Sequence, residues 1–466
     1  MGFYDQLETH GANDAVLTEG GESISYAALA AAADNLTCGV ARRRVGFLLC
    51  ENRFESLVGY LGFLRRRAIP ALINGSIDAG LFSELFAAYR PAYVYLPMER
   101  ASLVAGHKAL ATQGGYGLFE TDWVQDYETH EELALLLTTS GSTGSPKLVR
   151  LAYKNINSNA EAIAHYLSIN GTDRPITTMP MSYTFGLSII NSHLLRGAAT
   201  VMTEASLMSK RFWQTLNRQQ ASTFSGVPYH FEMLKQLRFS SMKLPSIKYL
   251  TQAGGKLGAE SAAEFAGVCE AKGIKFITMY GQTEATARMA YLPWEYAHTK
   301  AGSIGIAIPG GRFWLVDDAG RIVEDAETVG ELYYEGGNVS LGYAMGCADL
   351  NKGDENQGVL ATGDLAKRDR EGFYYIIGRK KRFLKLFGNR INLDEAESLL
   401  RASGYDCACT GTDDKLAIYV TREGQEAQIL KAISERTKIN PHGFAVVHID
   451  KIPRNEQGKI IYAALR

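Results

Sequence analysis

Short apolar runs alternate with helical segments between residues 133 and 279, and this alternation limits the possible folds more than any other feature. The apolar runs have the length and composition of buried strands, and the segments between them show helical periodicity. Such an alternation is typical of βαβ units around a largely parallel sheet. The expected strands are 133–137, 176–179, 199–203, 223–227, 247–251 and 275–279, and the expected helices are 155–167, 185–195, 211–220, 229–237 and 259–272.

The chain of 466 residues is too long for one compact core. A weaker alternation with strands at 45–49, 68–73 and 92–96 predicts a first α/β lobe, and short strands at 313–316, 321–323 and 330–334 predict a small β-barrel-like unit. We therefore predict an α/β protein of two doubly wound lobes and one small α/β C-terminal domain. The expected parts are an N-terminal domain 1–378, divided into 1–130, 131–300 and 301–378, and a mobile lid domain 379–466.

The charge balance favours a small-molecule ligand. Lys and Arg number 49 against 50 Asp and Glu, for a net charge of -1, so no overall positive charge supports nucleic-acid binding. No apolar run is long enough to span a bilayer and the N-terminus lacks a signal-type segment, which predicts a cytoplasmic protein. The six cysteines form no disulfide framework, and Cys407 and Cys409 are expected to be partly buried thiols on a strand; chelation is the alternative.

A stretch rich in hydroxyls and glycines follows the run 133–137 and ends in a lysine. Glycine lets backbone N–H groups turn towards an anion, hydroxyls add donors, and lysine adds a compact charge, as phosphate binding requires. The pattern is not a Walker loop, and on its own it is also typical of a flexible linker. The candidate phosphate ligands are Thr139, Ser140, Gly141, Ser142, Thr143, Gly144 and Lys147.

Four more clusters suit a nucleotide site, although each has an ordinary structural alternative. Residues 279–284 end a predicted strand, where open α/β sheets bind ligands, but could form a simple polar turn. Asp364 in Thr362-Gly363-Asp364 could bond ribose hydroxyls or cap a turn. The basic run 378–390 could be a solvated face, and Lys459 could be an exposed lysine on a loop.

Taken together, these motifs resemble those of the adenylate-forming superfamily, which includes acyl-CoA synthetases, 4-coumarate–CoA ligases, luciferases and the adenylation domains of nonribosomal peptide synthetases. Residues 139–147 resemble its phosphate loop TSGSTGxPK, 280–284 its YGxTE and 330–343 its GEL…G…GY segment. Residues 362–364 resemble its TGD and 378–397 its GRxK…G…E hinge region. Residues 453–459 resemble its PRxxxGK, so the motifs occur in order along essentially the whole chain.

The resemblance implies ATP and Mg²⁺ as ligands and assigns a role to each candidate. The loop 139–147 would bind phosphates, Tyr280 would stack on adenine, and Glu284 would hold Mg²⁺. Lys459 would be catalytic, because a carboxylate attacking a phosphate needs a cation to offset the repulsion. The remaining implied nucleotide contacts are Ala253, Gly254, Gly255, Gly281, Gln282, Thr283 (also counted as catalytic), Asp364, Arg379 and Arg390.

A second half-reaction is also implied, in which the small C-terminal domain rotates about a hinge residue, here Lys381, and admits a phosphopantetheine thiol. The co-substrate would be CoA. An acyl carrier protein bearing a phosphopantetheine arm is the alternative acceptor. A non-catalytic nucleotide or acyl-adenylate binding module is the alternative from another class of protein, disfavoured because all the implied catalytic residues are present.

The acid pocket is expected around Tyr183, Phe185 and Ala253. The segment 181–186 lacks the aspartate with which amino-acid-activating relatives bind an α-ammonium, so a small carboxylic acid without an α-amino group is expected. Arg288 stands where coumarate-type ligases have an apolar pocket residue. It is therefore a candidate for binding a hydroxyl or a second carboxylate of the substrate; an arginine facing solvent or a structural carboxylate is the alternative.

Overall fold

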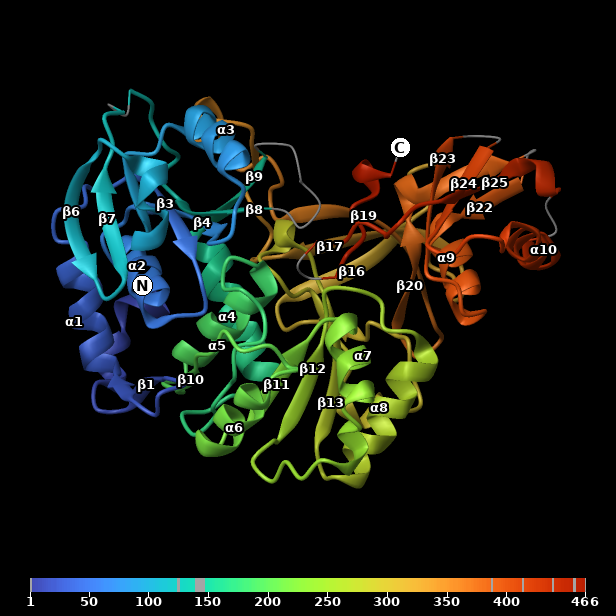
Figure 1. The fold of residues 1–466 in the computed structure, drawn as a ribbon, viewed down its shortest axis with the longest axis horizontal. Coiled ribbons are helices and arrows are strands. Elements are labelled where there is room, and N and C mark those ends of the chain that lie inside the picture. The colour runs from blue at the N-terminus through green and yellow to red at the C-terminus, as the bar shows by residue number, and fades with distance from the viewer. Residues whose placement is uncertain are drawn as a thin grey trace. The chain divides into compact units, whose positions relative to one another are not determined.

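The computed structural model describes residues 2–123, 126–138, 147–386, 389–412, 415–437, 440–455 and 458–465, without the side chains of 381, 383, 385, 389, 390, 402 and 436. The chain divides into two compact units (Figure 1). Unit 1 comprises residues 1–313 and 334–360, and unit 2 comprises 314–333 and 361–466.

An eight-stranded sheet forms the first layer of unit 1, in the order β18-β9-β8-β4-β3-β5-β7-β6. Its central strands β8, β4, β3 and β5 run parallel, and the flanking pairs are antiparallel. The strands are β3 (Val45–Cys50), β4 (Ile69–Asn74), β5 (Tyr93–Pro97), β6 (Lys108–Gln113), β7 (Tyr116–Glu120), β8 (Leu133–Thr138), β9 (Leu148–Ala152) and β18 (Gly342–Ala344).

Both faces of this sheet are covered by helices. Strand β3 is buried at all six positions; Phe47 packs with Phe82 of α3 (Ala79–Tyr89), and Leu48 packs on the opposite face with Leu57 of α2 (Phe54–Arg65). Helix α1 (Tyr26–Leu36) packs against α2 on that second face. Strands buried on both faces appear as continuous apolar runs, which is why the sequence indicated them.

The second sheet of unit 1 has the order β11-β12-β13-β14-β15 and is parallel from β11 to β13. Helices α6, α7 and α8 pack on one face through a cluster that includes Phe212, Phe231 and Phe265 (Figure 1). The elements are β11 (Thr223–Gly226), β12 (Tyr249–Gln252), β13 (Lys275–Tyr280), β14 (Ala290–Tyr291), β15 (Ile306–Ala307), α6 (Lys210–Arg218), α7 (Pro228–Gln236) and α8 (Ala259–Ala271).

Helices α4 (Tyr153–Tyr166) and α5 (Thr184–Leu194) lie in the core of unit 1, and all 11 residues of α5 are buried. Leu187 and Ile190 of α5 belong to the core of the first sheet, whereas Phe185 and Ile189 pack with Tyr249 and Ile277 of the second. Helix α5 therefore packs against both sheets. A small sheet of β10 (Thr200–Val201), β1 (Asp14–Leu17) and β2 (Ser23–Ser25) completes the unit.

Unit 2 contains most of a four-stranded sheet of order β16-β17-β19-β20, a hairpin β21–β22, and a three-stranded sheet of order β23-β24-β25. The strands are β16 (Gly311–Val316), β17 (Val329–Gly336), β19 (Val359–Arg368), β20 (Tyr374–Arg379), β21 (Phe383–Leu386), β22 (Asn389–Asn392), β23 (Cys407–Thr412), β24 (Lys415–Val420) and β25 (Phe444–His448). Helices α9 (Leu393–Ala402) and α10 (Glu426–Thr437) supply apolar residues to the core of the last sheet.

The predicted α/β class is confirmed, with three local corrections. Residues 176–179 form only an isolated bridge at Ile176, and 321–323 only a bridge at Ile322, because neither run extends its pairing. Strand β9 was not predicted, and it returns antiparallel beside β8. The first sheet therefore continues past residue 130, where the sequence suggested a change of lobe. Within the described ranges, every helix falls short of the length and apolar character that crossing a lipid bilayer requires.

The guanidinium of Arg150 on β9 is completely buried and fixes the segment that follows β17. It donates to the carbonyl oxygens of Leu341 (2.9 Å), Tyr343 (3.0 Å), Lys352 and Gly353 (3.2 Å), and pairs with Glu355 at 2.6 Å. Each of the three guanidinium nitrogens therefore has at least one acceptor within the protein. Arg150 thus holds residues 341–355 against the first sheet.

We expect Arg150→Met to destabilise the protein by about 3–5 kcal/mol, because four carbonyl groups lose their buried donor and Glu355 loses its partner. Urea unfolding followed by circular dichroism measures the loss. The control is Arg312→Met, whose side chain is 72% exposed in a surface pair with Glu335; it should change stability by less than about 0.5 kcal/mol. Equal effects of the two substitutions would contradict the assignment.

Candidate active site

Two predicted site segments of unit 1 lie at one edge of the second sheet. Gly226, Gln252 and Thr278 are in register on the parallel strands β11, β12 and β13, so the chain leaves neighbouring strands at the same edge. Ala253, Gly254 and Gly255 follow β12, and Gly281 to Glu284 follow Tyr280 at the end of β13. This is where open α/β sheets bind ligands. The structure thus brings together the residues expected around adenine.

The turn after β13 has a tightly fixed backbone. A Cβ on Gly281 would lie 1.5 Å from the carbonyl oxygen of Ala287, so only glycine fits there. Thr286 and Ala287 have positive φ angles of 59° and 130°, which are strained for residues other than glycine. Asn338 supports them by donating to the carbonyls of Ala285 (2.8 Å) and Arg288 (3.1 Å). The turn after β13, predicted to bind adenine, is therefore held in one conformation by its own contacts.

Glu284, Tyr343 and Lys147 form a cluster in unit 1. The Tyr343 hydroxyl donates to Glu284 Oε1 at 2.6 Å, and the ammonium of Lys147 lies 3.3 Å from the centre of the Tyr343 ring. Burial, and then the Glu284 carboxylate, raise the pKa of Tyr343, so its hydroxyl stays a donor. The ring of Tyr343 thus carries the cation on its face and orients the carboxylate with its hydroxyl.

This cluster fits a magnesium ion. Tyr343 is the sole hydrogen-bond donor to the Glu284 carboxylate among the described residues, and none of their cations pairs with it. Mg²⁺ is usually bound by one or two carboxylates together with substrate phosphates, so no larger ligand set is needed. In the parts of the chain that the structure describes, no group of three or more metal-ligating side chains occurs.

The aromatic residues expected at the acid pocket are buried beside the glycines of the β12 edge. Phe185 packs edge-on against Tyr183, with ring centres 6.4 Å apart. The Tyr183 hydroxyl lies 2.7 Å from where a Cβ on Gly254 would stand, and Gly254 has a φ of 78°. Burial raises the pKa of Tyr183 to about 12, so it stays neutral. Arg288 is also buried here, so the alternative in which it faces solvent is wrong.

Asp364 and Arg379, the predicted ribose ligands, are directly opposite each other on β19 and β20 of unit 2. The Asp364 side chain is buried, and Arg379 Nε lies 3.7 Å from its Oδ1. Asp364 also follows a turn in which its amide donates to the Thr362 hydroxyl at 3.1 Å. The Arg379 side chain, in contrast, is 68% exposed. The strand pair thus fixes the Asp364 carboxylate, whereas the exposed Arg379 side chain is free to change its conformation.

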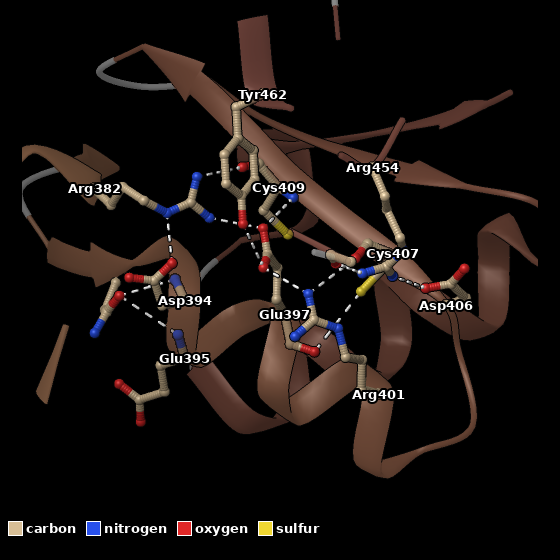
Figure 2. Close-up of polar contacts among 12 residues, drawn as sticks. Arg382, Asp394, Glu395, Glu397, Arg401, Asp406, Cys407, Cys409, Arg454 and Tyr462 are labelled. Atoms are coloured by element: carbon tan, nitrogen blue, oxygen red, sulfur yellow. Dashed lines mark hydrogen bonds and ion pairs between the residues drawn. The ribbon is translucent and has the colours of Figure 1, made fainter. Parts of the chain in front are cut away.

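A buried charge network fixes the C-terminal segment within unit 2 (Figure 2). Glu397 of α9 accepts bonds from Arg382 (2.7 Å), Arg401 (2.8 Å) and the hydroxyl of Tyr462 (2.9 Å). The Arg382 guanidinium also lies 3.8 Å from the centre of the Tyr462 ring. Burial and the Glu397 carboxylate raise the pKa of Tyr462, which keeps the hydroxyl protonated. Tyr462 therefore anchors the C-terminal segment to α9.

Lys459 lies in the turn that precedes this anchor. Its amide donates to Asn455 Oδ1 at 2.9 Å, and the Asn455 amide donates to the Lys459 carbonyl at 2.8 Å. Arg454 and Ile460 form an antiparallel bridge across the turn, and Arg454 pairs with Asp406 at 2.7 Å (Figure 2). The backbone around Lys459 is thus tied to unit 2 on both sides.

Some predicted residues lie outside the described part of the chain. These are the phosphate-loop residues Thr139, Ser140, Gly141, Ser142, Thr143 and Gly144, and the side chains of Lys381 and Arg390. Cys407 and Cys409 are buried free thiols on β23, as expected. Sequence reasoning gave no role to Tyr343 or Asn338. The only signal was that both lie in the segment 330–343, which resembles a family motif.

The chain belongs to the AMP-binding enzyme family, whose sequence profile matches residues 3–344. The resemblance drawn from the motifs is thereby confirmed. The chain is 26% identical to indoleacetate–CoA ligase of Aromatoleum aromaticum, over 94% of this chain and 91% of that one. It is also 26% identical to the nonribosomal peptide synthetase CmlP of Streptomyces venezuelae, over 93% of this chain and 46% of CmlP.

The fold is shared with solved structures. O-succinylbenzoate coenzyme A synthetase (MenE) from Bacillus subtilis in complex with AMP superposes with a TM-score of 0.81 at 21% identity, covering 100% of this chain and 98% of that one. The same synthetase has also been solved with ATP and a magnesium ion, and that structure superposes with a TM-score of 0.76 at 20% identity, covering 100% of this chain and 99% of MenE.

We expect Tyr343→Phe to raise the Mg²⁺ concentration needed for half-maximal ATP binding by about tenfold or more, because Glu284 loses the donor that orients it. Titration calorimetry with ATP at a series of Mg²⁺ concentrations measures the shift. Tyr333→Phe is the matched control and should change nothing. An unchanged Mg²⁺ dependence in the Tyr343 variant would show that this hydroxyl has no part in metal binding.

We expect Tyr462→Phe to accelerate amide hydrogen exchange in residues 458–465 by about tenfold or more, because a hydrogen bond to a buried carboxylate is lost. Mass spectrometry of the exchanged full-length chain measures it. In Tyr405→Phe, which removes a hydroxyl that accepts and donates no bond among the described residues, exchange should stay at the wild-type rate. Unchanged exchange in the Tyr462 variant would show that the anchor is unimportant.

Proposed function

We propose that this chain is an ATP-dependent acid–thiol ligase, which forms an acyl-adenylate with release of pyrophosphate and then transfers the acyl group to CoA. The observation that carries the proposal is the Glu284–Tyr343–Lys147 cluster, in which Glu284 follows the end of β13, next to the segment proposed to bind adenine. A carboxylate beside a lysine at this edge suits a magnesium-bound triphosphate.

The adenylation step needs positive charge, because an anionic carboxylate attacks an anionic phosphate. In the proposed reaction Lys147 binds phosphate oxygens of ATP, and Lys459 stabilises the charge that develops between the acid and the α-phosphate. Tyr343 holds Glu284 in the orientation that accepts a metal. Bound Mg²⁺ supplies further charge neutralisation on the phosphates. The adenine is proposed to stack on Tyr280, and Asp364 to accept bonds from the ribose hydroxyls.

For the second half-reaction, we keep the predicted hinge at Lys381 and the domain boundary between residues 378 and 379. The bonds of Arg382 to Asp394 and Glu397 support this assignment (Figure 2). They tie the residue after Lys381 to α9, so that a change of backbone angle at Lys381 would move α9 together with Arg382.

CoA is the proposed acceptor, since indoleacetate–CoA ligase matches almost the whole chain. The match to CmlP, a nonribosomal peptide synthetase, supports a carrier-protein thiol as the alternative acceptor. Thioester formation with CoA or with a phosphopantetheinylated carrier protein, measured with the same acid, distinguishes the two.

Acid-dependent exchange of labelled pyrophosphate into ATP tests the proposal without knowledge of the acceptor. A panel of carboxylic acids should yield at least one that supports exchange. With that acid, Lys459→Ala should slow exchange by about 100-fold or more, because a charge that acts in the transition state is lost. Lys451→Ala, which removes an exposed lysine of the same unit, is the control. A folded protein that gives no exchange with any acid in the presence of Mg²⁺ would refute the proposal.

A further inference from the structure

Arg288 is a buried cation surrounded by neutral groups. Its side chain is only 2% exposed. Nε donates to the Ser188 hydroxyl at 3.1 Å, and Nη1 lies 3.1 Å from the Tyr166 hydroxyl and 3.2 Å from the sulfur of Met279. The guanidinium carbon lies 5.1 Å from the centre of the Phe185 ring. The N–H groups on Nη2 have no acceptor among the described residues.

No carboxylate of the described residues pairs with this guanidinium. The buried carboxylate of Asp173 acts electrostatically on His193 and Tyr249, as Arg288 does, but it is already paired with Lys248 at 2.7 Å. His193 is neutral, because burial lowers its pKa to about 4. Tyr166 is neutral as well, because burial raises its pKa. Arg288 therefore has hydrogen bonds and an aromatic face but no counter-charge.

Such an arrangement is costly for a purely structural residue. An arginine taken out of water loses several kcal/mol of solvation free energy, which neutral partners recover only in part. The contrast with the buried Arg150 and the largely buried Arg382 is direct, because each of them pairs with a glutamate. The charge of Arg288 is thus left to pair with an anionic group of a bound ligand.

Arg288 lies between the segment predicted to bind the nucleotide and the residues predicted to line the acid pocket. A Cβ on Gly281 would lie 2.8 Å from the Cα of Arg288, so the arginine backbone contacts the adenine segment. Its guanidinium faces Phe185, which packs against Tyr183, and the Tyr183 hydroxyl lies beside Gly254. The arginine thus stands among the segments to which adenylate and acid are assigned.

We propose that Arg288 is a specificity-determining residue that binds a second anionic group, a carboxylate or sulfonate, on the acid substrate. The chain then activates acids with two anionic groups in preference to plain fatty or aryl acids. An anion is required rather than a hydroxyl, because a neutral acceptor adds a hydrogen bond but leaves the buried charge uncompensated. This inference rests on the proposed function.

Matched pairs of acids test it by pyrophosphate exchange. Succinate against butyrate and glutarate against valerate differ in charge and little in length. The wild-type enzyme should favour the dianion of at least one pair in kcat/KM by about 30-fold or more, and Arg288→Met should remove that preference by raising KM for the dianion. Arg288→Lys should retain part of it, because the charge remains but the fork of donors is lost. The surface variant Arg312→Met should keep the wild-type ratio.

Thermal unfolding separates recognition from a structural role. Arg288→Met should keep or raise Tm, because a buried uncompensated cation is removed, and 10 mM succinate, chosen as about the concentration of a weak ligand, should raise Tm of the wild type but not of the variant. A fall in Tm together with an unchanged acid preference would overturn the inference. Wild-type preference for the monoanion in every pair would also overturn it, while leaving the ligase assignment intact. Only absence of exchange with all acids would refute the ligase itself.

Discussion

The buried guanidinium of Arg150 is the interaction on which the arrangement of unit 1 depends. It gathers carbonyl groups from residues 341–353 onto β9, and so places Tyr343 where its hydroxyl meets Glu284 and its ring meets Lys147. These three residues come from distant parts of the chain. Because the guanidinium is fixed by geometry and fully desolvated, its bonds are directional and strong, and the cluster is assembled before ligands bind.

Buried charge is used in two different ways in this molecule. Arg382 and Arg401 converge on Glu397, with Tyr462 as a third donor, so the charges are matched and serve to hold unit 2 together. Arg288 has only neutral partners, although it is more deeply buried than either of these arginines. A matched network stabilises one conformation. An unmatched cation instead makes binding of an anion favourable, because the cost of desolvating the arginine has already been met during folding.

The sequence predicted those parts of the site that follow from a strand and its end. Tyr280 to Glu284 were found because an apolar run points to a strand and open α/β sheets bind ligands at strand ends, whereas Ala253 to Gly255 were found only through the family resemblance. Contacts between distant residues left no such signal: Tyr343 is 59 positions from Glu284. The sequence did not predict the burial of Arg288 either, since an isolated arginine is usually exposed to solvent. Strand β9 was missed because the glycine-rich stretch before it was interpreted as a phosphate loop or linker, and the next element predicted was the helix 155–167.

Helix α5 is buried along its whole length because both sheets of unit 1 pack against it. A change of side-chain volume within the helix must therefore be accommodated by two cores at once, which few substitutions achieve. The ends of such an element tolerate variation better than its middle. Divergence of acid preference among related chains should consequently concentrate at the flanks of α5, near residues 183–185, and at facing positions such as 288, while its interior changes slowly.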